Sequence, residues 1–331
     1  MSKKDIVLKA FNNEAVERVP VGFWFHFVVG DEFNQGVEKE EIVQKNIAGH
    51  KKFVQDFQPD FVKLMSDGFF AYPNKELAKG ASISELKKIE PIGEHHPWIE
   101  KQVKLVKELT DAFGEEAATF YNIFAPATYV KFLLKDSGKD VTIEDYFKED
   151  RETLKHVLDV IAEDIKVLSR RVITEGKADG IYLSVQNLQD KNIKNTDYLE
   201  IVTPSERKVL DEANRVSNNN ILHICGYEGV RNDLSIYVDY PAKAVNWAVT
   251  IENVSLEEGK KLFDGKAVIG GFANTDKDLL YKGSKKEIES ATEQLISKAG
   301  KKGIILGADC TVPSDIEFSR LEWVRKKAAR V

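Results

Sequence analysis

Short β-rich runs alternate with longer amphipathic windows along this chain, and this alternation limits the possible folds more than any other feature. Strands that alternate with helices predict a parallel sheet, because parallel neighbours need a helical crossover. Eight runs are short, rich in β-branched or aromatic residues and often preceded by glycine, proline, asparagine or aspartate: Val19–Phe25, Phe61–Met65, Thr119–Phe124, Gly180–Val185, Asn220–Cys225, Ala244–Val249, Ala267–Phe272 and Gly303–Gly307. Apolar residues recur at helical spacing between them, in Glu40–Phe57, Trp98–Phe113, Arg151–Thr174, Pro204–Arg215, Ser255–Phe263 and Ser284–Ala299.

The number of these units predicts a closed barrel. Eight βα units in 331 residues fit a single-domain (β/α)8 TIM barrel that spans residues 1–331. The alternative is an open doubly wound sheet, but the first run is followed by Phe27–Asp31, which lacks the G-x-G-x-x-G turn of that fold. Hydrophobic residues make up 42% of the chain, which is enough for a large core and excludes a disordered protein.

The charge and the cysteine content of the chain restrict the cellular compartment and the binding partners that we expect for it. The 48 lysines and arginines against 54 acidic residues give a net charge of −6, so we expect no nucleic-acid partner. The start of the chain lacks the apolar stretch of a secretory signal, and no run of about 18 apolar residues predicts a membrane span. Two cysteines are typical of a reducing compartment, so we expect a cytoplasmic protein.

Three side chains form a candidate metal site. His223 and Cys225 lie two residues apart in the fifth run and therefore project to the same side of a strand. Cys310 follows the last run, and the carboxyl ends of barrel strands share one mouth, where the active sites of such barrels lie. An imidazole and two thiolates suit Zn²⁺, and three protein ligands leave a fourth position open, as in catalytic sites. The structural alternative is two buried thiols and one hydrogen-bonded core histidine.

The His-x-Cys…Cys pattern resembles the zinc motif of methylcobamide:thiol methyltransferases and of cobalamin-independent methionine synthase. The surrounding sequence resembles the wider uroporphyrinogen decarboxylase superfamily over nearly the whole chain, at Glu17–Val21, Asp60–Asp67, Ala125–Thr128, His223–Gly226, Gly270–Asn274 and Leu279–Ser284. This resemblance also implies a barrel, independently of the strand count.

Four positions distinguish the branches of the superfamily. Uroporphyrinogen decarboxylases carry arginines just after the first strand, where this chain has Phe23–Val28 without arginine, and an anionic substrate would lose its strongest contacts there. Their third-strand tyrosine aligns with Phe132, and their histidine after the last strand is replaced within Gly307–Cys310. Only the acidic residue after the second strand remains, as Asp67. We therefore expect the methyltransferase branch and keep a uroporphyrinogen decarboxylase-type carboxy-lyase as the alternative.

The resemblance implies a zinc-dependent enzyme that moves a methyl group from a methylated corrinoid to a thiol. In that case His223, Cys225 and Cys310 hold Zn²⁺, and methylcobamide carried by a partner corrinoid protein is the methyl donor. The acceptor is a small-molecule thiol, and the resemblance further implies a homodimer. A different class of function remains open, namely a non-catalytic barrel that binds a corrinoid protein.

Further residues near the predicted strand ends are candidates for the site. We expect Asp67 to be catalytic, either by orienting the substrate or by hydrogen bonding to the histidine ligand. Gln186 and Asn187 follow the fourth run and are predicted to bind polar groups of the substrate. Asp309 is a candidate for hydrogen bonding near the metal, and Glu252 is a candidate fourth ligand.

Overall fold

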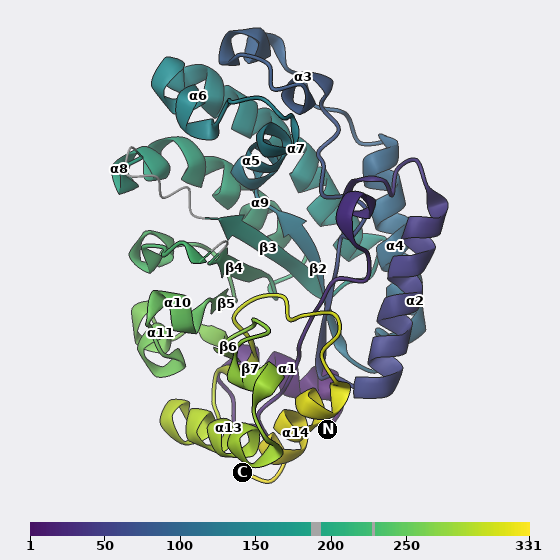
Figure 1. Cartoon of the computed structure of the whole chain (residues 1–331), viewed down its shortest axis with the longest axis vertical. Helices are drawn as coiled ribbons and strands as arrows, with labels where there is room; N and C mark the ends of the chain where they lie inside the picture. Colours follow the sequence, from purple (N-terminus) through teal and green to yellow (C-terminus); the bar gives the residue numbers. More distant parts are fainter. Residues whose placement is uncertain (187–192, 227–228) are drawn as a thin grey trace.

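The computed structural model describes residues 1–186, 193–226 and 229–331 and shows a curled parallel sheet surrounded by helices (Figure 1). In this part of the chain the sheet has seven strands, which lie in sequence order: β1 (Phe61–Leu64), β2 (Ala118–Phe124), β3 (Gly180–Gln186), β4 (Ile221–Cys225), β5 (Ala244–Trp247), β6 (Ala267–Phe272) and β7 (Ile304–Ala308). Sequential order with parallel pairing throughout is typical of TIM-like folds and contradicts a doubly wound sheet, in which the strand order reverses.

The helices lie on the outside of the curled sheet (Figure 1). They are α1 (Lys3–Phe11), α2 (Glu40–Phe57), α3 (Lys75–Ala78), α4 (Pro97–Phe113), α5 (Pro126–Asp136), α6 (Ile143–Glu149), α7 (Arg151–Thr174), α8 (Asn195–Asp197), α9 (Thr203–Asn214), α10 (Val249–Glu252), α11 (Leu256–Leu262), α12 (Leu279–Lys282), α13 (Lys285–Ala299) and α14 (Phe318–Ala328). Short turns of other helical types are η1 (Gly30–Asn34), η2 (Ile83–Lys88), η3 (Tyr198–Val202) and η5 (Leu234–Tyr237). Among the described residues, no helix combines the length and the apolar character that crossing a membrane requires.

The predicted helices are found with small changes at their ends, because amphipathic periodicity and capping are local signals. α2 and α7 have the predicted bounds. Ser284 caps α13: its hydroxyl accepts from the Glu287 amide, and the Glu287 carboxylate accepts from the Ser284 amide. Seven of the eight predicted strands are likewise present within one or two residues of their expected ends.

The prediction of a strand at Val19–Phe25 is wrong. The segment is extended and lies between β7 and β1, because Gly22 N–H donates to Leu306 and Asp60 N–H donates to the Val21 carbonyl. It forms only one bridge, between Val21 and Leu306. Pro20 has no N–H to donate, and the Val21 N–H donates to the Asp60 carboxylate instead of a strand backbone.

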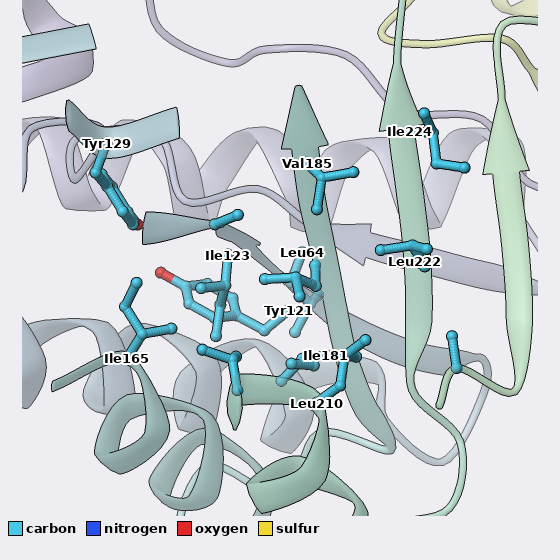
Figure 2. Close-up of a cluster of buried hydrophobic side chains, with 14 of the residues drawn as sticks. Leu64, Tyr121, Ile123, Tyr129, Ile165, Ile181, Val185, Leu210, Leu222 and Ile224 are labelled. Atoms are coloured by element: carbon cyan, nitrogen blue, oxygen red, sulfur yellow. The ribbon is translucent and has the colours of Figure 1, made fainter. Parts of the chain in front are cut away.

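Side chains on the two faces of the sheet form two separate apolar layers. Outward-facing residues of the strands pack against the helices, as Figure 2 shows for Leu64, Ile123, Val185, Leu222 and Ile224 with Ile165 of α7 and Leu210 of α9. Inward-facing residues fill the inside of the curled sheet, among them Trp24, Phe61, Phe120, Tyr182, Ile221 and Ile305. Helix α1 contacts β1, β2 and β7 and adds Phe11 to this inner layer, so it covers the end at which the strands begin.

Candidate metal centre

Two side chains of β4 meet one from the segment after β7 at the carboxyl end of the sheet. His223 and Cys225 point to the inner face of β4, while Leu222 and Ile224 pack outward against the helices. The Cys310 Sγ atom lies 3.7 Å from Cys225 Sγ and 3.5 Å from His223 Nε2. All three ligand atoms lie within 4.8 Å of one another, so the side chains that the sequence places at one mouth do lie together.

The distances match the edges of a tetrahedral zinc site. With Zn–S bonds of about 2.3 Å and Zn–N bonds of about 2.0–2.1 Å, a tetrahedron puts two sulfurs about 3.8 Å apart, and a sulfur and a nitrogen about 3.5 Å apart. A disulfide needs sulfurs about 2.05 Å apart, and both cysteines are free. The donor set therefore fits a zinc ion with three protein ligands and one open position.

Asn246 of β5 determines which nitrogen of His223 faces the sulfurs. Its amide Nδ2 donates to the carbonyls of Ile269 and Ala308, which can only accept, so its Oδ1 faces His223. The His223 Nδ1–H donates to this oxygen, and Nε2 keeps a lone pair on the side of Cys310. This is the tautomer that a metal-binding histidine needs.

The two cysteine side chains are joined by a hydrogen bond. A hydrogen bond from the Cys225 thiol, with His223 and Lys63 nearby, lowers the pKa of Cys310 well below its ordinary value. The same hydrogen bond, together with burial, raises the pKa of Cys225. One of the two sulfurs is therefore ready to ionise, and thiolates are the form that binds a metal.

A small cavity of about 120 Å³ opens beside these three side chains. It is lined by His26, Lys63, Met65, Phe70, Asn122, Phe124, Phe132, Ser184, Gln186, His223, Cys225, Cys310 and Thr311. Its polar wall is internally bonded, because the Ser184 hydroxyl donates to Asn122 Oδ1 and Asn122 Nδ2 donates to Ser66. The cavity is far larger than one water molecule, so a small organic ligand fits next to the open metal position.

A buried lysine lies in the same cavity. Lys63 points inward from β1 and is 4% exposed. Its Nζ atom lies 4.3 Å from the centre of the Tyr182 ring and 5.4 Å from that of Trp24, so two aromatic faces hold the ammonium group. Burial lowers the pKa of Lys63 to about 8.

Asp67 does not contact His223 and holds a different histidine. Its side chain accepts hydrogen bonds from His26 Nδ1 at 2.8 Å and from the Phe27 amide at 2.7 Å. The expected hydrogen bond to His223 is thus wrong, because Asn246 already occupies Nδ1 of that ring. Asp67 is fully buried and not among the cavity-lining residues, so it reaches the cavity only by orienting His26.

Aromatic rings form the outer wall of the cavity. Phe70 packs edge-on against Phe124 with ring centres 4.7 Å apart, and His26 contacts Phe70 at 5.6 Å. Phe70 and Phe132 also line an outer hollow of about 480 Å³ formed with the residues of η1. The inner cavity and the outer hollow therefore share an aromatic border.

Comparison with known proteins now identifies the family. The family model of uroporphyrinogen decarboxylase matches residues 66–330. The chain belongs to the uroporphyrinogen decarboxylase family. No curated protein matches the sequence.

Solved structures share the fold of this family member at low sequence identity. A methyltransferase from Methanosarcina mazei superposes with a TM-score of 0.68 and 15% identity, covering 100% of this chain and 99% of its own. A putative vitamin-B12 independent methionine synthase from Listeria monocytogenes gives a TM-score of 0.57 and 12% identity, covering 96% of this chain and 99% of its own. A B12-independent methionine synthase from Shewanella sp. W3-18-1 gives 0.55 and 13%, covering 96% and 97%. At these identities the similarities show a common fold.

In this member of the uroporphyrinogen decarboxylase family, the described wall of the inner cavity offers few cationic groups to a polyanionic substrate. Among the residues described as lining the cavity, none is an arginine, and Lys63 is the one lysine. Phe132 lines the cavity where the resemblance led us to expect a tyrosine. Phe23 and Trp24 are buried in the core.

The other predicted residues have mixed outcomes. Gln186 ends β3 and lines the cavity, and its Oε1 atom is buried without a hydrogen-bond partner among the described residues. Asn187 lies outside the described residues. Asp309 accepts from the Thr250 amide through Oδ2, and its Oδ1 atom is buried without a hydrogen-bond partner among the described residues. Glu252 is wrong as a fourth ligand, because both of its carboxylate oxygens accept hydrogen bonds from Asn232 and it lies outside the metal cluster.

Sequence reasoning missed Lys63, Asn246, His26 and Ser184. A signal existed for Lys63, because it shares strand parity with the inward-facing Phe61 and is the only charge in an apolar run. For Asn246 the signal was weaker: an amide inside a strand of apolar residues. Asn246 can accept from His223 because the two residues lie in register on neighbouring strands, and strand pairing determines this register.

Proposed function

We propose that this chain is a zinc-dependent methyltransferase that moves a methyl group from a methylated corrinoid, carried by a partner protein, to a small thiol. One observation carries the proposal: His223, Cys225 and Cys310 match three corners of a tetrahedral zinc site whose remaining side adjoins a ligand-sized cavity. Bound there, Zn²⁺ supplies a Lewis acid that favours the thiolate form of a thiol at neutral pH.

The residues of this chain prepare the acceptor for transfer. Asn246 keeps the Nε2 lone pair of His223 directed to the site, and the rings of Phe70 and Phe124 limit the access of water. Gln186, whose Oε1 atom has no hydrogen-bond partner among the described residues, offers a polar atom to the part of the acceptor away from its sulfur. The thiol loses its proton to solvent, its sulfur lone pair forms the new S–C bond, and the pair of the broken C–Co bond stays on the corrinoid.

We expect a partner protein to bind at the outer surface of the site. Apart from Met1, the large hydrophobic side chains that are exposed in the described part of the chain are Val29, Leu199, Val230 and Leu279. Each follows a strand, or the extended segment 19–25, in the chain. Segments that follow the strands lie on the side of the sheet where the strands end, which is the side from which a corrinoid protein would reach the candidate metal site.

We further propose that the architecture is a single (β/α)8 barrel over residues 1–331. The segment 19–25 would take the place of an eighth strand, because its backbone bonds to β7 on one side and to the residue before β1 on the other. The carboxy-lyase alternative is less well supported, since a porphyrinogen with several carboxylates would meet one lysine and no arginine in the described cavity wall.

The decisive experiment follows demethylation of methylcobalamin with 2-mercaptoethanol as acceptor, using the absorbance of the corrinoid. Zinc-loaded protein should catalyse the reaction, and His223→Ala and Cys310→Ser should reduce the rate about 100-fold or more, as expected when a metal site is lost. His95→Ala, which changes an exposed histidine outside the site, is the control and should leave the rate unchanged. Full activity after complete removal of metal would disprove the proposal.

A further inference from the structure

Lys63 is a buried cation with no anionic hydrogen-bond partner. Its side chain extends into the curled sheet, where the rings of Tyr182 and Trp24 face the ammonium group. No described residue forms a hydrogen bond or ion pair with it. Removing an ammonium group from water is costly, so the charged form of Lys63 is favoured when a negative charge lies nearby.

The charged groups around Lys63 are few. Among the residues described as lining the cavity with Lys63, none is an aspartate or a glutamate, and Cys225 and Cys310 are the side chains there that can carry a negative charge. The Asp67 carboxylate already accepts from His26 and from a backbone amide, so part of its charge is used there. Within the described cavity wall, a counter-charge for Lys63 can therefore come only from the cysteine sulfurs or from a ligand that enters the cavity.

Zinc bound by the three candidate ligands would change the balance of charge around Lys63. If Zn²⁺ were held there by two cysteinates and a neutral His223 ring, its two positive charges would be cancelled and the loaded centre would carry no net charge. Lys63 then remains as an unbalanced cation beside a neutral centre. A ligand that enters the cavity with one negative charge restores neutrality, whereas a neutral ligand does not.

We propose that Lys63 is a specificity-determining residue that selects an acceptor bound as an anion, namely a thiolate, over neutral ligands of the same size. This inference rests on the proposed function. It also explains release of the product: methylation converts the thiolate into a neutral thioether, which no longer balances the charge of Lys63. The residue thus favours binding of the acceptor and gives the neutral product no such advantage.

The test uses Co²⁺-substituted protein, in which the visible and near-ultraviolet absorbance of the metal reports ligand binding without any turnover. Ethanethiol is the ionisable probe, and ethyl methyl sulfide is the neutral probe. We expect Lys63→Met to weaken ethanethiol binding about tenfold or more, because an opposite charge nearby favours the thiolate by at least about one pKa unit. Binding of ethyl methyl sulfide should stay unchanged, and Lys63→Arg should recover most of the thiol affinity.

Controls separate the two proposals. Lys277→Met removes an exposed lysine and should match the wild type with both probes. If the wild-type protein shows no spectral response to ethanethiol, the proposed function fails, and this inference with it. If the wild type responds but Lys63→Met loses affinity for both probes equally, or loses its cobalt, Lys63 only shapes the site and the inference alone is overturned.

Discussion

At the scale of single residues, an uncharged side chain sets the tautomer of His223, one of the candidate metal ligands. Asn246 combines two donated hydrogen bonds to backbone carbonyls with one oxygen that accepts from both His223 and the Tyr182 hydroxyl. Because the carbonyls fix the orientation of the amide, the amide fixes the tautomer of the imidazole. An aspartate there would add a negative charge, whereas asparagine leaves the charge of the centre unchanged.

Replacing Asn246 tests this role directly. Asn246→Leu leaves His223 Nδ1–H without its partner, and we expect zinc affinity to fall about 10- to 100-fold. Competition with a chromophoric chelator measures the change. Tyr182→Phe removes the other hydrogen bond to the same oxygen and should lower the affinity much less; equal losses in the two variants would contradict a specific effect on the histidine.

At the scale of elements, a buried carboxylate joins α9 to its neighbours away from the metal centre. Glu206 of α9 is fully buried, and its carboxylate accepts from the hydroxyls of Tyr198 and Tyr240, while Tyr237 donates to Tyr198. Burial raises the pKa of Glu206 to about 7 in spite of these bonds. The contact between α9 and η3 therefore depends on the protonation of one side chain.

The sign of the resulting pH dependence follows from linkage. Below about pH 4.5, Glu206 is protonated in both folded and unfolded chains. Between about pH 4.5 and pH 7, Glu206 is ionised in the unfolded chain but still protonated in the folded chain. As pH rises through this range, the residue therefore lowers the free energy of unfolding by up to about 1.4 kcal/mol per pH unit. Above pH 7 its contribution is constant. Glu206→Gln should remove this component, so the variant gains thermal stability relative to the wild type between pH 5 and pH 8. If the melting temperatures of the two proteins change in parallel with pH across this range, the pH dependence does not come from Glu206.

At the scale of the whole molecule, one ion pair connects the start of the chain to the first strand of the sheet. The Arg18 guanidinium donates to both carboxylate oxygens of Asp60 at 2.7 and 2.6 Å, and the Val21 amide donates to the same carboxylate at 2.8 Å. Asp60 is fully buried. These bonds hold the segment 19–25 against the beginning of β1. On its other side, the same segment bonds to β7.

Breaking this connection should destabilise the whole fold. Asp60→Ala leaves a partly buried guanidinium and a buried amide without partners, and we expect a loss of about 3–5 kcal/mol in the free energy of unfolding. Urea denaturation measures the loss. Glu108→Ala removes an exposed ion pair with Lys51 and should cost less than about 1 kcal/mol. A cost for Asp60→Ala as small as that of the control would show that the segment is held by other contacts.

Sequence alone was sufficient for seven of the strands, for the longest helices and for the grouping of the three candidate metal ligands. α2, α7 and β6 have the expected bounds because hydrophobic periodicity and capping act within one segment. His223 and Cys225 were placed on one side of a strand by parity, and Cys310 by its position after a strand end. These inferences need no knowledge of which strand lies beside which.

Tertiary structure decided everything that depends on neighbours. Val19–Phe25 has the composition of a strand, but Asp60 takes the Val21 amide and prevents a regular ladder. Asn246 lies beside His223 because β4 and β5 pair in that register, and Lys63 faces Tyr182 across the inside of the sheet. Register and curl arise from the packing of the whole sheet, so the partners that tune the metal ligands appear only once the chain is folded.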